Sequence, residues 1–389
     1  MNTHVPRRKV CVVITARPSY SRIRTTLLAL RARADVELQL VVAASALLDQ
    51  YGDVSKFIER DGFVISARVF MLIEGESNLT SAKTTGIGLV ELTTVFDNLK
   101  PEVVVTIADR YETIATAIAA AYMNIPLAHL QGGEVTGSID EKVRHAVTKL
   151  ADVHFVSTPL ARERVVRMGE LPERVHITGC PSIDIAAEVL AAPALDFDPY
   201  VKYGGVGHSP ELASGYVVVM QHPVTTESGQ ARQQVVETLE AASQLGLPVL
   251  WFWPNVDAGS TEFSQAIRAF REQGRSARFH FFKNMGSVDF LRLLCQARCL
   301  IGNSSVAIRE CSFLGVPAVD IGSRQGGREC AENVLHVTHQ RDGILAAIRT
   351  QIAAGRQPSS TLYGDGQTGG RIAALLATLT FSIEKKLPY

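Results

Sequence analysis

The sequence predicts an α/β protein made of two doubly wound domains in tandem. Three observations lead to this prediction. The chain has 389 residues, which is too many for one ordinary hydrophobic core. Short β-branched runs alternate with helical patterns along almost the whole chain. Residues 190–213, rich in Ala, Pro and Gly, interrupt this alternation near the middle.

The first series of elements predicts a parallel sheet. Its strands are expected at residues 10–14, 38–43, 103–107, 126–130 and 153–157, because these are short and nearly continuous apolar runs. Helical patterns separate them, as at residues 22–33, 112–123 and 141–150. In such sheets ligands bind at the carboxyl ends of the strands, so the residues directly after each strand are the informative ones.

The second series repeats this arrangement, with strands expected at residues 216–220, 249–252, 279–282, 299–301 and 317–321. Between the two series, residues 203–210 have the composition of a linker or mobile loop. Two such blocks predict two Rossmann-like domains that face one another across a cleft. We place the first domain at residues 1–188, the second at 189–370, and a C-terminal helix that packs back on the first domain in 371–389.

The composition excludes several classes of function. Lys and Arg together number 39, as do Asp and Glu, so no bulk basic surface is expected for nucleic acid or an acidic membrane. No apolar run approaches the roughly 18 residues of a membrane span, and the N-terminus carries no export signal. The six cysteines are scattered and are expected to be buried, reduced thiols and not metal ligands. We therefore expect a cytoplasmic enzyme.

The segment after the first strand, Thr15-Ala-Arg-Pro-Ser-Tyr-Ser21, suggests an anion site. It is not a G-x-G-x-x-G fingerprint, so no dinucleotide cofactor is expected. Arg17 stands beside a proline-set turn with hydroxyls nearby, including Ser21, and this group could clamp a diphosphate. A capping loop with an exposed arginine would explain the segment equally well.

Three carboxylates lie near strand ends of the first series: Asp109, Glu134 and Asp140. Asp109 is followed by Arg110, which points a guanidinium at the same strand end. Three neighbouring carboxyl groups can divide into protonated and ionised roles, as acid–base catalysis requires. A salt bridge or helix cap would also explain Asp109, and Asp140 would also complement the dipole of the helix it begins.

Two polar groups follow strands of the second series. His222 stands at a strand end with its position set by the next residue, Pro223, where it could touch a phosphate or move a proton. Asn255, in the segment 254–259, suits sugar or phosphate contacts. An Asx-turn would account for Asn255 without a ligand.

The strongest single signal is the segment Gly302-Asn-Ser-Ser305, a turn between a strand and a helix. Main-chain N–H groups and two hydroxyls at a helix start form an anion site. Glu310 lies over a turn further on, where its carboxylate can accept both ribose hydroxyls. Arg324 adds positive charge near the same strand end. Phosphate donors and a diol acceptor at this spacing predict a sugar nucleotide.

In order between residues 10 and 340, these segments together resemble the UDP-N-acetylglucosamine 2-epimerases. They are most similar to the hydrolysing branch that makes N-acetylmannosamine for sialic acid. The segments that carry the resemblance are 15–21, 109–110, 132–140, 221–226, 254–259, 302–305 and 322–334.

The resemblance implies a GT-B fold, a UDP-amino sugar substrate, no metal or redox cofactor, and a homodimer or homotetramer. It also implies an elimination–addition route. A base removes the C2 proton as UDP leaves, and water then adds to the 2-acetamidoglucal. The implied catalytic residues are Asp109, Glu134, Asp140 and His222. The residues expected to hold UDP are Arg17, Ser21, Arg110, Asn255, Gly302, Asn303, Ser304, Ser305, Glu310 and Arg324.

One position departs from the family pattern. Many relatives carry Glu where this chain has Gln131, which can act neither as acid nor as base. Either Glu134 takes that role or the position only binds sugar hydroxyls. Four alternatives remain open: a non-hydrolysing epimerase, a GT-B glycosyltransferase, a sugar-nucleotide sensor, and a hydrolysing epimerase of UDP-2,4-diacetamido-2,4,6-trideoxyglucose from the legionaminic acid route.

Overall fold

The computed structural model describes residues 7–48, 54–75, 78–107, 110–135, 140–254 and 259–388, which form two compact units. The first unit holds the described residues of 7–134, 140–184 and 364–388. The second holds residue 135 and the described residues of 185–363. The chain changes unit within α8 (Ser182–Ala191) and again at Tyr363/Gly364. The domain limits 1–188, 189–370 and 371–389 stay a prediction for how the chain divides into independently folding parts.

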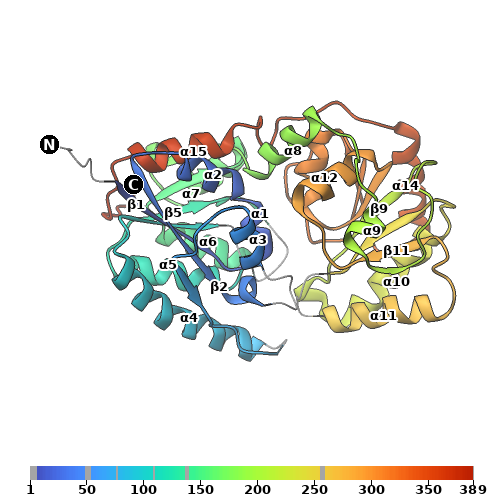
Figure 1. The fold of residues 1–389 in the computed structure, drawn as a ribbon, viewed down its shortest axis with the longest axis horizontal. Coiled ribbons are helices and arrows are strands. Elements are labelled where there is room, and N and C mark those ends of the chain that lie inside the picture. Colours follow the sequence, from blue (N-terminus) through green and yellow to red (C-terminus); the bar gives the residue numbers. More distant parts are fainter. Residues whose placement is uncertain are drawn as a thin grey trace. The chain divides into compact units, whose positions relative to one another are not determined.

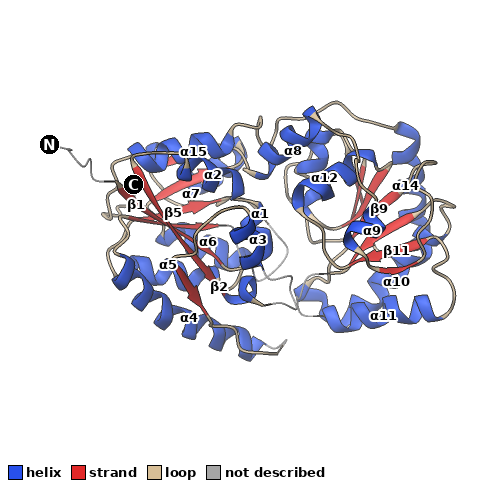
Figure 2. Cartoon of the chain, in the orientation of Figure 1, coloured by secondary structure: helices blue, strands red, loops and turns tan. Residues whose placement is uncertain are grey.

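The first unit contains a parallel sheet (Figures 1 and 2). It has seven strands in the order β3-β2-β1-β4-β5-β6-β7. The five predicted strands are confirmed. Their bounds are β1 (Arg8–Ile14), β2 (Val36–Ala43), β4 (Val103–Ile107), β5 (Leu127–Leu130) and β6 (Val153–Val156). The edge strands β3 (Ala67–Val69) and β7 (Val175–Ile177) were not predicted, because three partly exposed residues form no apolar run.

Helices cover both faces of this sheet, as a doubly wound fold requires. Alternate residues of β1 enter two separate cores: Val12 packs with residues of α2 and α15, whereas Cys11 packs with residues of α4 and α5. The helices of the first unit are α1 (Arg17–Ser21), α2 (Arg24–Arg31), α3 (Val54–Arg60), α4 (Asn78–Leu99), α5 (Thr113–Tyr122), α6 (Asp140–Leu150), α7 (Pro159–Arg167) and α15 (Thr368–Thr378). None of the described helices is long and apolar enough to cross a membrane.

The C-terminal segment returns to the first unit, where α15 packs beside α2 (Figure 1). Asp184 caps the start of α15, because its carboxylate accepts from the main-chain N–H groups of Thr368 and Gly369 at 2.9 and 2.6 Å. The C-terminal helix predicted in residues 371–389 begins earlier, at Thr368, and ends at Thr378. Arg8 explains this end, since its guanidinium donates to the carbonyls of Leu376 and Leu379 at 3.0 and 2.8 Å.

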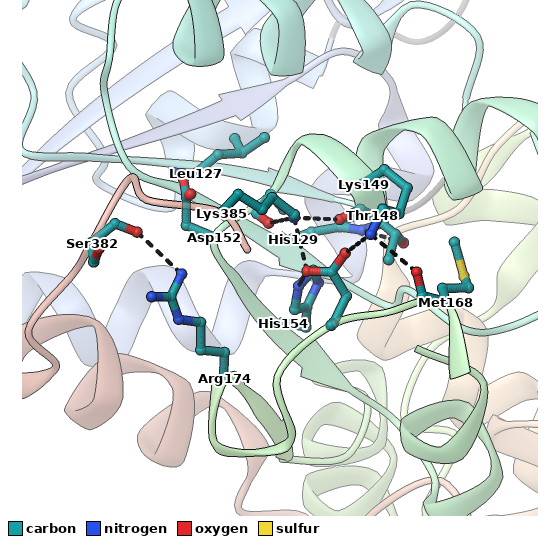
Figure 3. Close-up of polar contacts among 12 residues, drawn as sticks. Leu127, His129, Thr148, Lys149, Asp152, His154, Met168, Arg174, Ser382 and Lys385 are labelled. Atoms are coloured by element: carbon teal, nitrogen blue, oxygen red, sulfur yellow. Dashed lines mark hydrogen bonds and ion pairs between the residues drawn. The ribbon is translucent and has the colours of Figure 1, made fainter. Parts of the chain in front are cut away.

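Beyond α15 the tail is held by a buried carboxylate. Glu170, 4% exposed, accepts from Lys149 at 2.6 Å, Lys385 at 2.8 Å and His154 at 3.1 Å (Figure 3). Burial raises the pKa of the Glu170 carboxyl, but the hydrogen bonds from these three side chains outweigh it and lower the value to about 2. Burial also lowers the pKa of His154 against the opposing effect of Glu170.

The second unit contains a sheet with the order β14-β13-β12-β9-β10-β11-β8, parallel except for β8. The five predicted strands are again confirmed, as β9 (Val217–Met220), β10 (Val249–Phe252), β11 (Phe279–Phe282), β12 (Cys299–Gly302) and β13 (Ala318–Ile321). The edge strand β14 (Val334–Val337) was not predicted, since none of its residues is fully buried. The principal helices of this unit are α10 (Ala231–Ser243), α11 (Ser260–Glu272), α12 (Ser287–Gln296) and α14 (Arg341–Ala354).

The prediction of a linker or mobile loop at residues 203–210 was wrong. The helix α9 (Pro199–Tyr203) leads into β8 (Val206–Gly207), which pairs antiparallel with β11. Both ring nitrogens of His280 contact carbonyl oxygens of this segment, those of His208 at 2.7 Å and Gly204 at 2.9 Å. A Cβ atom on Gly205 would lie 2.4 Å from the His280 ring. The glycines therefore allow close packing, which composition alone does not distinguish from flexibility.

Candidate functional site

In each unit the strand order reverses at one point, between β1 and β4 in the first sheet and between β9 and β12 in the second. Residues that follow strands at such a point are where ligands bind in doubly wound sheets. The candidate site residues follow these strands or their neighbours.

Arg17 is the first residue of α1, directly after β1, and is half-buried. Tyr20 of the same helix donates from its hydroxyl to Asp61 at 2.6 Å, and Arg24 donates to the same oxygen at 2.7 Å. Ser21 donates to the carbonyl of Arg17 at 3.4 Å. The Tyr20–Asp61 bond attaches α1 to the residue that follows α3, and so fixes the helix that carries Arg17 after β1.

Asp109 lies outside the described residues, but Arg110 beside it is described. Arg110 Nε donates to Glu112 Oε1 at 3.0 Å. Glu112 is 1% exposed, and its other oxygen has no hydrogen-bond partner among the described residues. Burial raises the pKa of the Tyr111 hydroxyl to about 12, and the negative charge of Glu112 acts in the same direction. Glu112 was missed from the sequence, although the pair Arg110-x-Glu112 at a strand end was available as a signal.

Glu134 follows β5 and is 4% exposed. Ser157, the first residue after β6, donates from its hydroxyl to Glu134 Oε1 at 2.9 Å. The buried Arg144 donates to the main-chain carbonyl of Glu134 at 2.8 Å and to Glu141 Oε2 at 2.8 Å. The carboxylate of Glu134 is thus oriented by a neighbouring strand end and stands near a buried positive charge.

Ser157 was also missed from the sequence, although the strand-end rule that selected Glu134 applies to it.

Asp140 is the first residue of α6 and is half-buried. This position is compatible with an acid–base carboxylate and with a carboxylate that complements the helix dipole. Gln131 is 2% exposed and has a left-handed backbone with φ of +67°. Its amide nitrogen contacts Cys180 Sγ at 3.1 Å.

In the second unit, the structure brings together His222, Gly302 and Asn303. The Asn303 side chain accepts from His222 N at 2.8 Å and donates to His222 O at 2.8 Å. Gly302 has φ of +133°, and a Cβ atom there would lie 2.1 Å from Met220 O. Only glycine therefore allows β12 to approach the end of β9 in this way.

The predicted turn after β12 is confirmed, but the helix expected to start there begins only at Glu310. Ser304 Oγ accepts from Val306 N at 3.4 Å and caps a 3₁₀ turn at Ser305–Ala307. A separate short helix, α13 (Glu310–Leu314), follows. The break has a physical cause: Asn333 Nδ2 donates to Ala307 O at 3.1 Å, so that carbonyl is bonded outside the helix.

Glu310 and Arg324 lie at this end of the second sheet. Glu310 is the first residue of α13, and its Oε2 atom is buried with no hydrogen-bond partner among the described residues. Arg324 donates to Asn303 O at 3.2 Å, and the buried Gln325 donates to the same oxygen at 2.8 Å. Gln325 was not predicted. Asn255 lies outside the described residues.

Within the described ranges, no group of three His, Cys, Asp or Glu side chains is placed to hold a metal ion. Of the six cysteines, which form no disulfide, five are buried and Cys330 is half-buried. The oriented side chains of the candidate site, such as Glu134, Asn303 and Arg324, can form hydrogen bonds and, where charged, stabilise an opposite charge.

The two doubly wound sheets, with oriented polar groups after β5, β9 and β12, define a protein of the GT-B fold class. A solved structure of the Methanocaldococcus jannaschii UDP-GlcNAc 2-epimerase, in complex with UDP-GlcNAc and UDP, has the same fold. It superimposes with a TM-score of 0.80 at 16% identity over 95% of this chain and 99% of that chain.

Residues 28–377 match the family model of UDP-N-acetylglucosamine 2-epimerase, and the chain belongs to this family. It is 31% identical to the UDP-N,N′-diacetylbacillosamine 2-epimerase (hydrolyzing) of Legionella pneumophila over 96% of both chains. It is 28% identical to the UDP-N-acetylglucosamine 2-epimerase of Neisseria meningitidis, over 93% of this chain and 92% of that one. The protein is a nucleotide-sugar 2-epimerase.

Proposed function

We propose that the protein is a hydrolysing UDP-N-acetylglucosamine 2-epimerase, which releases UDP and N-acetylmannosamine. The observation that carries the nucleotide part is the buried Oε2 atom of Glu310, which lacks a hydrogen-bond donor among the described residues. An unsatisfied buried carboxylate oxygen is costly, and a ribose hydroxyl would supply the missing donor. The two hydroxyls and the turn at Ser304 and Ser305 suit the adjacent diphosphate.

Nucleotide binding in this proposal rests mainly on the second unit. Arg324 supplies positive charge at Asn303, and the Asn303 side chain holds the end of β9, which carries His222. These groups can stabilise the negative charge that develops as UDP leaves the sugar. We assign supporting roles in UDP binding to Arg17, Ser21, Arg110, Asn255 and Gly302.

Proton transfer rests on the carboxylates of the first unit. Removing the weakly acidic C2 proton requires a base held in one orientation, and the hydrogen bond from Ser157 supplies this for Glu134. Asp109 and Asp140 are the further acid–base candidates, with His222 assisting at the diphosphate or the sugar.

The relatives support one alternative substrate. The Legionella pneumophila relative is named as a hydrolysing 2-epimerase of UDP-N,N′-diacetylbacillosamine, and a substrate of that kind would differ at C4 and C6 of the sugar. A non-hydrolysing epimerase, which keeps UDP on the sugar, is the second alternative. We also propose that the enzyme acts as a homodimer or homotetramer.

The test is to incubate the protein separately with UDP-N-acetylglucosamine and UDP-N,N′-diacetylbacillosamine in heavy water and to follow the products by NMR. We expect free N-acetylmannosamine, UDP and deuterium at C2. If the protein turns over only UDP-N,N′-diacetylbacillosamine, that sugar nucleotide is the substrate. An epimer that is still linked to UDP would exclude the hydrolytic reaction, and a product without deuterium at C2 would exclude proton abstraction.

A further inference from the structure

We propose that Glu112 is a positioning residue, which orients the guanidinium group of Arg110 for the diphosphate of the nucleotide sugar. This role rests on the proposed binding of UDP by Arg110. It adds to that site a residue that acts through Arg110 and does not touch the ligand itself. Both residues lie in the segment between β4 and α5 of the first unit.

The side chains of Arg110 and Glu112 form an ion pair in which one partner is buried. Arg110 Nε donates to Glu112 Oε1 at 3.0 Å, and the two side chains are 23% and 1% exposed. A guanidinium group has five N–H donors in one plane, and this bond uses the one nearest the main chain. The opposite edge of the plane, formed by Nη1 and Nη2, is then the edge with which Arg110 can bind a phosphate group through two hydrogen bonds.

The main chain of Arg110 is fixed by the same short segment. Thr113 N donates to Arg110 O at 2.9 Å, and Thr113 Oγ1 donates to the same oxygen at 2.6 Å. A flexible arginine loses rotamer entropy when a ligand immobilises it. Because Glu112 and Thr113 restrict Arg110 beforehand, less entropy is lost on binding and the affinity for a diphosphate is higher.

Helix capping does not explain Glu112. It occupies the N-cap position of α5, yet its carboxylate accepts no hydrogen bond from the described N–H groups of that helix. Its Oε2 atom is buried and has no hydrogen-bond partner among the described residues. A buried carboxylate with an unsatisfied oxygen costs stability, so the fold gains little from a charge at this position. The contact that accounts for Glu112 is therefore the one with Arg110.

Two substitutions of Glu112 separate its orienting role from its charge. Glu112→Met removes the acceptor for Arg110 Nε, so it should raise the Kd for UDP roughly tenfold and lower kcat/KM to a similar extent. Glu112→Gln keeps a side-chain oxygen for Nε and should stay within about threefold of the wild type in both quantities. Uridine lacks the diphosphate and should bind all three proteins equally. Calorimetry measures the Kd for UDP, and an NMR titration measures the Kd for uridine.

A cycle of single and double variants tests whether Glu112 acts through Arg110. Arg110→Met should weaken UDP binding, and adding Glu112→Met to it should have little further effect. Thermal melting should give nearly the same Tm for the wild type and Glu112→Met, because the side chain of Arg110 is 23% exposed and its charge stays in contact with water. The matched control is Glu163→Met, which removes the carboxylate of an exposed pair with Arg167 on α7 and should leave UDP affinity unchanged.

Three results would overturn the proposal: an unchanged Kd for UDP in Glu112→Met, an equal loss of affinity for UDP and uridine, or losses that multiply in the double variant. If a variant folds poorly, both ligands still report on its folded fraction, so the comparison between them stays valid. A wild-type protein that binds no UDP would contradict the proposed function itself, and with it this role of Glu112. Failure of the positioning role alone leaves UDP binding and turnover by the wild type intact, so the two failures are distinguishable.

Discussion

The side chain of Asn303 and the main chain of His222 hold one another through two hydrogen bonds of 2.8 Å, although the residues are 81 positions apart. Asn303 is 0% exposed and follows β12, whereas His222 follows β9. The pair therefore joins two strand ends at the point where the order of the second sheet reverses. Asn303 therefore stabilises the fold of the second unit. Through its contacts with His222 and Arg324 it also positions the proposed nucleotide site.

Asn303→Ala should lower the free energy of unfolding by about 2 kcal/mol, because it leaves a buried N–H and a buried carbonyl of His222 without partners. It should also weaken UDP binding. Urea unfolding and isothermal titration calorimetry measure the two effects. Asn303→Asp keeps the acceptor but removes the donor, so it should also be destabilising. Unchanged unfolding in both variants would contradict the role assigned to this pair.

Glu310→Gln should raise the Kd for UDP roughly tenfold, equivalent to about 1.4 kcal/mol, and change kcat at saturating substrate much less. The reason is that the buried Oε2 atom is proposed to accept from a ribose hydroxyl. Calorimetry with UDP and steady-state kinetics separate the two quantities. The matched control is Glu262→Gln, an exposed carboxylate in the first turn of α11 of the same unit. Equal UDP affinity in the wild type and in Glu310→Gln would show that Glu310 does not bind the ribose.

Ser157 and Glu134 should behave as a coupled pair in catalysis. Glu134→Gln should lower kcat by roughly 100-fold or more, because the amide cannot exchange a proton with the sugar. Ser157→Ala should lower kcat roughly tenfold, since the hydroxyl that orients the carboxylate is lost.

Once Glu134 is replaced, removal of the Ser157 hydroxyl should have little further effect on kcat, and Ser157→Thr should recover part of the activity of Ser157→Ala. Kinetics of the two single variants and the double variant measure this coupling. If the reductions in kcat of the two single variants multiply in the double variant, Ser157 does not act through Glu134.

The cluster of Glu170, His154, Lys149 and Lys385 should make the first unit sensitive to acid (Figure 3). The pKa of Glu170 is lowered to about 2 from an ordinary value of 4.5. Its stabilising contribution, on the order of 2 kcal/mol, is therefore present above pH 4.5 and is lost as the pH falls from 4.5 towards 2. The lowered pKa of His154 acts in the same direction below pH 6.5.

Unfolding of the wild type and of Glu170→Gln, followed at several pH values between 7 and 3, measures this contribution. The wild type should be the more stable at pH 7, and the difference should shrink below pH 4.5. Lys385→Met removes one partner from the tail and should destabilise the protein at pH 7. A difference between wild type and Glu170→Gln that does not change with pH would contradict the assignment.

Much of the fold was predictable because buried parallel strands are short and almost wholly apolar. The runs at residues 103–107 and 249–252 coincide with β4 and β10. The edge strands β3, β7 and β14 escaped prediction, because edge strands are partly exposed and lack this pattern. The segment 203–210 was misread, because glycine serves close packing against β11 as well as flexibility.

The candidate site was predictable in part for a similar reason. The strand-end rule selects Glu134, His222 and the segment 302–305 from local sequence alone. It does not show that Ser157 orients Glu134 or that Asn333 ends the turn after Ser305, because these partners lie elsewhere in the chain.

The sequence by itself determined the order of the buried strands and of the helices between them, and the polar residues that follow those strands, since both depend on neighbours along the chain. Only the tertiary structure decided which strand ends lie together and what each polar atom contacts. Packing placed β9 beside β12, so that Asn303 meets His222, and it left Glu310 Oε2 buried without a donor among the described residues. Hydrogen bonds between distant residues depend on the position of strands within a sheet, and local residue preferences do not contain that information.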